Sequence, residues 1–216
     1  MNIILSQPPV IDLFHAGYGL NYMKKIVNTI LVPLVDVNGN ITGYADKMTA
    51  HVRGDLHLAF SVMVVRKQND GVEYLLQRRA MHKYHSGGLW ANTCCSHPLP
   101  NEDINTAARR RIAEELGIKA SLDLLNVGSI RYKHHLENDL IEHEFDHILI
   151  AKVTTLGWEN NPDEVMEARW WKESEVVNQL SNNPDIFSAW FAQVFAFARA
   201  NVNASKMLLS PVPEMN

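Results

Sequence analysis

The sequence predicts an α/β fold with an α+β layered arrangement, in which mixed β-sheets are flanked by helices. Strand-like patterns come first, within residues 30–41 and 57–78, and a helical pattern follows over residues 102–116. A further strand pattern at 141–153 is then followed by a second helical pattern at 184–201. Strands succeeded by a helix, twice along one chain, are typical of layers packed around one hydrophobic core.

The length and composition of the chain favour one water-soluble domain. The chain has 216 residues, of which 46% are hydrophobic and 20% charged, and these values are ordinary for a protein with a sizeable core. We expect the domain to span residues 28–205. Residues 1–27 are expected to form an N-terminal extension of unknown role, and residues 206–216 a C-terminal tail.

The charge and the cysteine content exclude several classes of partner. A net charge of -4 and a pI near 6.2 predict no basic face for nucleic acid. No apolar run approaches the ~20 residues that span a bilayer. The two cysteines of the chain, Cys94 and Cys95, are adjacent and cannot cross-link distant segments, which points to a reducing compartment. These features predict a cytoplasmic protein that binds neither nucleic acid nor membrane, and they leave the choice between monomer and homodimer open.

Two hairpins are expected in the first half of the domain. Strand-like stretches at 30–32 and 34–37 precede the turn signal Asn38–Gly39–Asn40. The stretches at 57–65 and 73–78 flank a second polar turn that contains glycine. Each turn signal predicts that the strands on either side of it pair with each other.

The helix predicted over residues 102–116 is the best-marked element of the chain. Acidic residues stand in its expected first turn, and Gly117 stands where a left-handed C-terminal cap is expected. At helical spacing Ala108, Arg111 and Glu115 fall on one face, so a basic and an acidic side chain project together. A solvated surface ion pair would have the same spacing.

The same helix carries a resemblance to a known family. Five residues stand at the spacing of the Nudix signature: Glu102, Arg110, Glu114, Glu115 and Gly117. The chain thus resembles the Nudix superfamily, which implies a Nudix fold with a strand-loop-helix element that binds a divalent metal and a diphosphate. Ser96 stands where the signature begins with Gly, and Arg111 stands where it has a Glu. An Arg at this position suits binding a diphosphate better than cleaving it.

A segment upstream of the helix carries a more specific resemblance. Cys95 and His97 lie in Asn92–Pro98, whose residues are Asn-Thr-Cys-Cys-Ser-His-Pro. Most single cysteines are inert packing, but this segment resembles the active-site segment of type I isopentenyl-diphosphate isomerases. The resemblance extends over residues 30–190. It implies interconversion of isopentenyl diphosphate and dimethylallyl diphosphate in isoprenoid precursor biosynthesis, with Cys95 as a catalytic acid/base.

The resemblance also implies a site for a divalent metal. Glu142 and Glu144 would point to one face of a strand, with His143 and His147 on the other. Two carboxylates held together in a core need a cation, and an exposed acidic strand face is the alternative. Imidazole and carboxylate ligands in octahedral geometry favour Mn²⁺ or Mg²⁺, with Zn²⁺ as a further candidate. The implied ligands are His51, His57, His97, Glu142 and Glu144.

A diphosphate substrate further requires a cluster of basic side chains. Glu115 would hold a second ion, Mg²⁺, together with the diphosphate, because Mg²⁺ binds through few carboxylates plus substrate phosphates. Taken singly, each Lys or Arg could equally be a solvated surface charge. The positions that resemble the substrate contacts of the family are Lys47, Arg79, Lys83, Ser96 and Arg111.

The implied reaction moves a double bond by adding one proton to the substrate and removing another. The resemblance assigns these transfers to Cys95 and Glu144, with Tyr132 as a hydrogen-bonding relay beside Glu144. Trp190 would stabilise the developing cation, and core packing of the C-terminal helix is the alternative for this residue. The rival functions are a Nudix pyrophosphohydrolase of a small diphosphate, against which Arg111 argues, and a non-catalytic ligand-binding Nudix protein.

Overall fold

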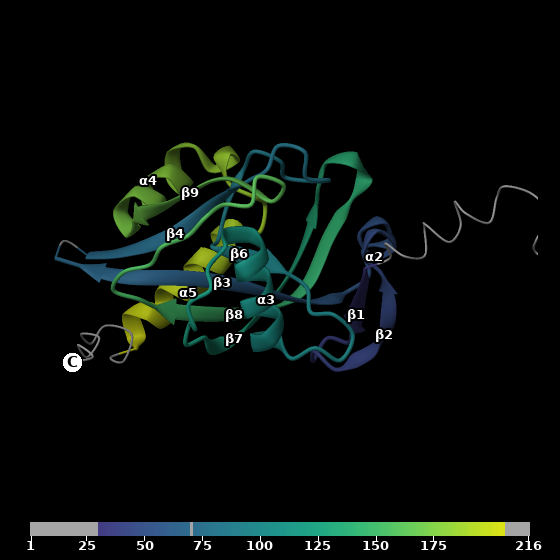
Figure 1. Cartoon of the computed structure of the whole chain (residues 1–216). Helices are drawn as coiled ribbons and strands as arrows, with labels where there is room; N and C mark the ends of the chain where they lie inside the picture. The colour runs from purple at the N-terminus through teal and green to yellow at the C-terminus, as the bar shows by residue number, and fades with distance from the viewer. Residues whose placement is uncertain (1–29, 70, 206–216) are drawn as a thin grey trace, which may run out of the picture. The chain divides into compact units, whose positions relative to one another are not determined.

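The structure, a computed structural model, describes residues 30–69 and 71–205. The predicted N-terminal extension and C-terminal tail lie outside these residues, so the outer boundaries of the domain stay predictions. From Leu31 on, the described residues belong to one compact unit. The strands of this unit form a mixed sheet (Figure 1).

Both predicted hairpins are confirmed. Strand β1 (Leu31–Val35) pairs with β2 (Ile41–Asp46) in the antiparallel sense. Strand β3 (His57–Gln68) likewise pairs with β4 (Gly71–Arg79). The short polar turns between the partners account for both pairings.

Strand β3 is the centre of the sheet. On one side it pairs with β6 (Cys94–Ser96) and then with β4, and on the other side it runs parallel to β8 (Ile141–Lys152). The strand predicted at 141–153 is therefore confirmed. The other strands of the described residues are β5 (Trp90–Ala91) beside β4, β7 (Leu125–His135) antiparallel to β8, and β9 (Val165–Lys172) antiparallel to β4.

The predicted helix at 102–116 is α3 (Ile104–Leu116), which begins two residues later than expected. Asp103 is its N-cap, and the Asp103 carboxylate accepts a hydrogen bond from the backbone N–H of Thr106 at 3.0 Å. The acidic residues therefore precede the first turn instead of lying within it. Gly117 ends the helix in the left-handed conformation, with φ of 60°, as predicted.

The prediction of one continuous helix over 184–201 is wrong in its first part. Pro184–Ile186 form a short 3-10 turn, and α5 begins only at Phe191 and ends at Ala204. Phe187 is extended and bridges to Trp90 of β5, and this pairing interrupts the helical path. Trp190 is consequently the N-cap of α5, at the end of the helix and not within it.

Two helices were not predicted from the sequence. Helix α2 (Lys47–Arg53) begins after Asp46, whose side chain caps it, and ends at Gly54 with φ of 68°. Helix α4 (Glu173–Asn182) follows β9 directly. Both are too short to show a clear helical period. Within the described ranges, every helix is too short or too polar to cross a membrane.

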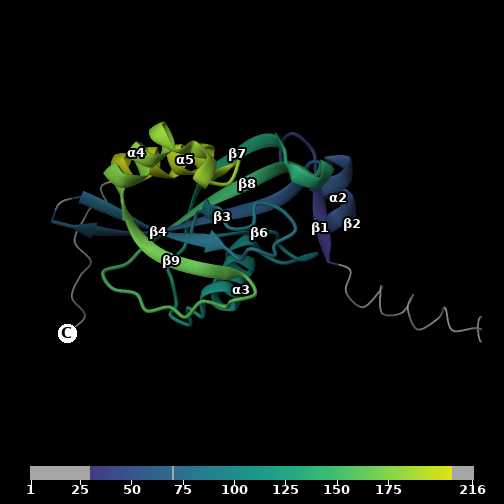
Figure 2. The ribbon, with the colours of Figure 1, turned by 90° about the horizontal axis from the view of Figure 1, so that it is seen from above.

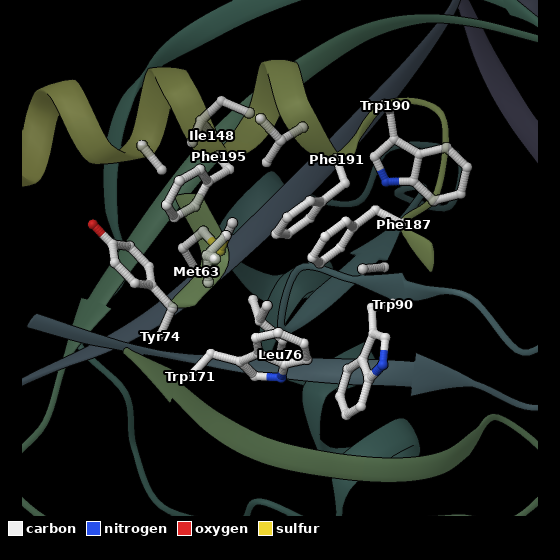
Figure 3. Packing of buried hydrophobic residues seen from close by; sticks show 14 of the residues in the cluster. Met63, Tyr74, Leu76, Trp90, Ile148, Trp171, Phe187, Trp190, Phe191 and Phe195 are labelled. Atoms are coloured by element: carbon white, nitrogen blue, oxygen red, sulfur yellow. The ribbon is translucent and has the colours of Figure 1, made fainter. Parts of the chain in front are cut away.

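Helices cover both faces of the sheet at β3, which is why residues 57–65 are all buried. Residues such as Phe60 and Val62 pack with α3 on one face, while Met63 and Val65 pack with α4 and α5 on the other. Figure 2 shows α3 on the opposite side of the sheet from α4 and α5. Figure 3 shows the second of these cores, in which aromatic rings from α5 and the neighbouring strands lie around Met63.

Candidate active site

The sheet face covered by α5 changes from polar to apolar along its central strands. His57 of β3 lies opposite Glu144 of β8, and Cys95 of β6 lies opposite Ser61 of β3. Further along the same face, Met63 already belongs to the aromatic core. Because side chains alternate between the two faces of a strand, the polar groups gather at one end of this face.

The predicted metal ligands come together at this polar end. One ligand atom from each of the five residues lies within 4.8 Å of all the others, and every residue except His97 is buried. His97 Nε2 is 2.9 Å from Glu144 Oε1 and 3.2 Å from His57 Nε2, and His51 Nε2 is 3.2 Å from Glu142 Oε2. Adjacent ligands that are each ~2.1 Å from one ion lie about 3 Å apart, so these separations fit a shared cation.

Backbone carbonyls fix the direction of two of the imidazole rings. The Nδ1–H of His51 donates to the carbonyl of Lys47 at 2.7 Å, and the Nδ1–H of His57 donates to the carbonyl of Asp55 at 2.8 Å. The Nε2 lone pairs therefore face the cluster. Among the described residues, His51 Nε2 and Glu142 Oε2 are both buried without a hydrogen-bond partner. Acceptors that face one another in this way fit a divalent ion.

Cys95 lies beside the ligand cluster on β6. Its Sγ atom is 3.7 Å from Ser61 Oγ, and the residue is partly buried, whereas Cys94 is fully buried in the core under α3. Burial raises the pKa of the Cys95 thiol well above its usual value, and the charges of Glu144 and Asp146 raise it further. The thiol is therefore protonated at neutral pH and can act as an acid.

Tyr132 of β7 lies opposite Glu144 in the sheet. The Tyr132 hydroxyl donates a hydrogen bond to Glu144 Oε2 at 2.5 Å and lies 3.2 Å from Asp146 Oδ2. Burial, followed by the charges of Asp146 and Glu144, raises the pKa of Tyr132 well above its usual value. The hydroxyl therefore keeps its hydrogen and remains a donor to the carboxylate.

The predicted anion-binding residues surround one pocket, together with Cys95 and Glu144. Glu164 lies between two of them, with its carboxylate oxygens 2.5 Å from Lys83 Nζ and 3.3 Å from Arg111 Nη2. Glu164 therefore neutralises part of a strongly positive site. The predicted contacts that line the pocket are Lys47, Arg79, Lys83, Ser96 and Arg111.

The alternative of a solvated Arg111–Glu115 surface pair is wrong. Arg111 Nη2 donates to Glu115 Oε1 at 2.7 Å, and the two side chains are only 18% and 5% exposed. Gln77 Nε2 donates to the other Glu115 oxygen at 2.9 Å. Each Glu115 oxygen therefore accepts a hydrogen bond from a neighbouring side chain.

Trp190 contributes to the pocket and to the core. Its side chain lines the pocket and is 2% exposed, and it belongs to the aromatic core under α5. The indole N–H donates to Asn92 Oδ1 at 3.3 Å, and the guanidinium of Arg79 lies 5.5 Å from the ring centre. Trp190 therefore lines the pocket, as predicted, and also packs in the core, which was the alternative.

Several polar residues around the ligand cluster were not predicted from the sequence. His85 Nε2 lies 2.9 Å from Glu142 Oε1, but His85 belongs to the loop at 80–89, which has no strand or helix period. Ser61 is hidden in an apolar strand and gives no signal. Asp146 could have been found, because it continues the alternation of the Glu-x-Glu pair.

Comparisons with known proteins agree with this arrangement. The NUDIX domain model matches residues 55–191. The isopentenyl-diphosphate Delta-isomerase of Photobacterium profundum is 48% identical over 166 residues, which cover 77% of this chain and 92% of that protein. The protein of the same name from Pectobacterium atrosepticum is 43% identical over 165 residues, which cover 76% of this chain and 89% of that protein.

Solved structures share the fold at low sequence identity. DR0079 from Deinococcus radiodurans matches with a TM-score of 0.60 and 12% identity, over 78% of this chain and 98% of that one. The NUDIX domain of NrtR from Shewanella oneidensis matches with a TM-score of 0.54 and 14% identity, over 67% of this chain and 87% of that one. These likenesses confirm the predicted Nudix fold and nothing beyond it. The domain match and the high identity to full-length relatives show that the chain belongs to the isopentenyl-diphosphate Delta-isomerase family of NUDIX proteins.

Proposed function

We propose that this pocket interconverts isopentenyl diphosphate and dimethylallyl diphosphate, with Cys95 and Glu144 as the two acid/base groups. The observation that supports this most is that a protonated thiol and a carboxylate line one pocket together with four basic side chains. The basic side chains suit a diphosphate, and the thiol and carboxylate suit two proton transfers on a hydrocarbon.

Diphosphate binding would rearrange the ion pairs of the pocket. Lys83 and Arg111 share Glu164 in this structure, and a diphosphate offers them more negative charge than one carboxylate does. Arg111 can bind phosphate oxygens in a bidentate manner. If Arg111 turns toward the diphosphate, Glu115 becomes free to hold Mg²⁺ together with the substrate.

The isomerisation needs one proton donor and one proton acceptor. Cys95 gives its proton to the terminal methylene carbon of isopentenyl diphosphate, and positive charge develops at the adjacent tertiary carbon. Glu144 then takes a proton from the carbon on the diphosphate side of that centre, and the double bond forms there. The face of the Trp190 ring can stabilise the intervening charge, and the burial of this side chain helps to exclude water.

The His51–His57–His97–Glu142–Glu144 cluster would hold the acceptor in place. A divalent ion bound there would neutralise the two carboxylates and fix the position of Glu144. Five protein ligands exceed the four of a structural zinc site. The donor set therefore supports Mn²⁺ or Mg²⁺, with Zn²⁺ as a further candidate.

The reaction is tested by comparing two products in one assay. Purified protein given Mg²⁺, Mn²⁺ and isopentenyl diphosphate is expected to form the dimethylallyl isomer without release of phosphate, as followed by NMR and a phosphate assay. Phosphate without isomer would instead indicate the pyrophosphohydrolase, and absence of any turnover would indicate a binding protein. The tight pairing of Arg111 with Glu115 argues against the hydrolase, because it removes a free carboxylate from α3.

The pKa of Lys47 predicts an alkaline limit for substrate binding. Burial, followed by repulsion from Lys83 and Arg111, lowers the pKa of Lys47 to about 8. Lys47 is charged below this pH and neutral above it, so kcat/KM is expected to fall above pH 8, by at most about tenfold per pH unit. Lys47→Arg keeps its charge and should move this limit to higher pH. An unchanged limit in the variant would show that another group causes it.

A further inference from the structure

We propose that Ser61 and Asp146 are positioning residues that couple proton loss at Cys95 to proton gain at Glu144. The proposal rests on the roles given above to Cys95 and Glu144. Ser61 and Asp146 are both fully buried. They would act by setting the acceptor to which the Ser61 and Tyr132 hydroxyls donate, without contacting the substrate.

A continuous row of polar contacts joins the thiol to the carboxylate. Ser61 Oγ lies 3.7 Å from Cys95 Sγ and 2.7 Å from Asp146 Oδ2. Tyr132 Oη lies 3.2 Å from the same Asp146 oxygen and 2.5 Å from Glu144 Oε2. The register of the sheet places Ser61 opposite Cys95 and Tyr132 opposite Glu144. We call this row, from Cys95 through Ser61, Asp146 and Tyr132 to Glu144, the Ser61–Asp146 bridge.

The number of hydrogens in the bridge makes its two ends interdependent. Ser61 and Tyr132 each lie between two acceptors, yet a hydroxyl has one hydrogen to donate. Before the reaction, the Tyr132 hydrogen satisfies the carboxylate of Glu144, which is its closer acceptor. The Ser61 hydrogen then satisfies Asp146.

The two proton transfers change the acceptor to which each hydroxyl donates its hydrogen. Once Cys95 is a thiolate, it becomes the stronger acceptor for the Ser61 hydroxyl. Once Glu144 carries a proton, it donates to Tyr132 Oη, and the Tyr132 hydrogen is free to turn to Asp146. Asp146 Oδ2 therefore loses one donor and gains the other, so a change at either end favours the change at the opposite end. Within the bridge, the hydrogens that change direction are those of the Ser61 and Tyr132 hydroxyls.

The other oxygen of Asp146 supports the view that Oδ2 makes the connection. Asp146 Oδ1 is buried and has no hydrogen-bond partner within the described ranges. The Asp146 side chain accepts hydrogen bonds from Ser61 and Tyr132 through Oδ2. Removing this oxygen would therefore separate the two hydroxyls from each other.

The test is a double-mutant cycle measured with and without Asp146. Ser61→Ala is expected to lower kcat about 10-fold or more, with KM within about twofold, and Tyr132→Phe is expected to lower it further. The double variant should lose about 3- to 30-fold less than the product of the single effects, because both changes break one bridge. In an Asp146→Leu background this coupling should vanish. Asp146→Val replaces that background if the leucine variant fails to fold.

Matched variants separate positioning from general damage. Ser61→Thr restores the hydroxyl and should recover most of kcat. Ser188→Ala removes another buried hydroxyl, one without a hydrogen-bond partner in the described residues, and should leave kcat unchanged. Turnover by the wild-type protein tests the proposed reaction independently. Multiplicative effects in both backgrounds, or a loss of bound metal that accounts for the loss of kcat, would overturn the role of the bridge.

Discussion

A Cys95→Ala variant is expected to lose about 10⁴-fold in kcat, the upper end of what one acid/base group contributes. The substrate alkene is unactivated, so the reaction cannot begin without a strong proton donor. Binding of the diphosphate and of the metal does not use the sulfur atom. KM and metal content should therefore stay within about twofold of the wild-type values, as measured by steady-state kinetics and elemental analysis.

Cys94→Ala is the matched control for this experiment. Cys94 is the neighbouring residue, and its side chain packs in the core under α3. Its loss should reduce the free energy of unfolding by about 1 kcal/mol and leave kcat near the wild-type value. Equal losses of kcat in the two variants, or full activity of Cys95→Ala, would refute the role proposed for Cys95.

Loss of the divalent ion is expected to have the second largest effect, on activity and on stability. Loss of a residue that only supports a ligand costs about 10- to 100-fold in metal affinity or activity, so Glu142→Gln should lower kcat at least that much. An ion present at 100 times its dissociation constant stabilises the fold by about 2.7 kcal/mol. Removing it should lower the Tm of a chain of this size by roughly 5–10 °C.

The metal prediction is checked by titrating chelator-treated protein with Mn²⁺, Mg²⁺ and Zn²⁺. Kinetics, calorimetry and metal content are measured at each step. His147→Gln is the control, because this imidazole lies on the same strand as Glu142 but alternates to the other face. Chelated protein that keeps its full rate and its Tm would contradict the proposed site.

The parts of the site that follow local rules could be predicted from the sequence. Glu142 and Glu144 share a face because the side-chain period of a strand is two, and Gly117 ends α3 because glycine accepts the left-handed conformation. The roles of the histidines as metal ligands and of Cys95 as an acid/base were predicted from the family resemblance and not from a local physical rule. The structure adds their convergence to a few ångströms, which no local pattern could supply.

The parts that were missed depend on contacts between distant segments. Ser61 and Asp146 are 85 residues apart and meet only because β3 and β8 pair in parallel. The break before α5 arises because Phe187 pairs with Trp90, which competes with continuation of a helix. Hydrophobic periodicity carries no information about such pairings. The helix predicted from it therefore included residues 184–190, which lie before the start of α5.

Strand β8 makes the site sensitive to changes in chain length. Glu142, Glu144 and Asp146 occupy alternate positions of one strand, which is held between β3 and β7 on its two sides. A slip of one residue would turn all three acidic side chains away from the pocket at once. A substitution in this strand removes one component of the site, whereas an insertion or deletion of a single residue that shifts its register would remove the metal ligands, the proton acceptor and the bridge together.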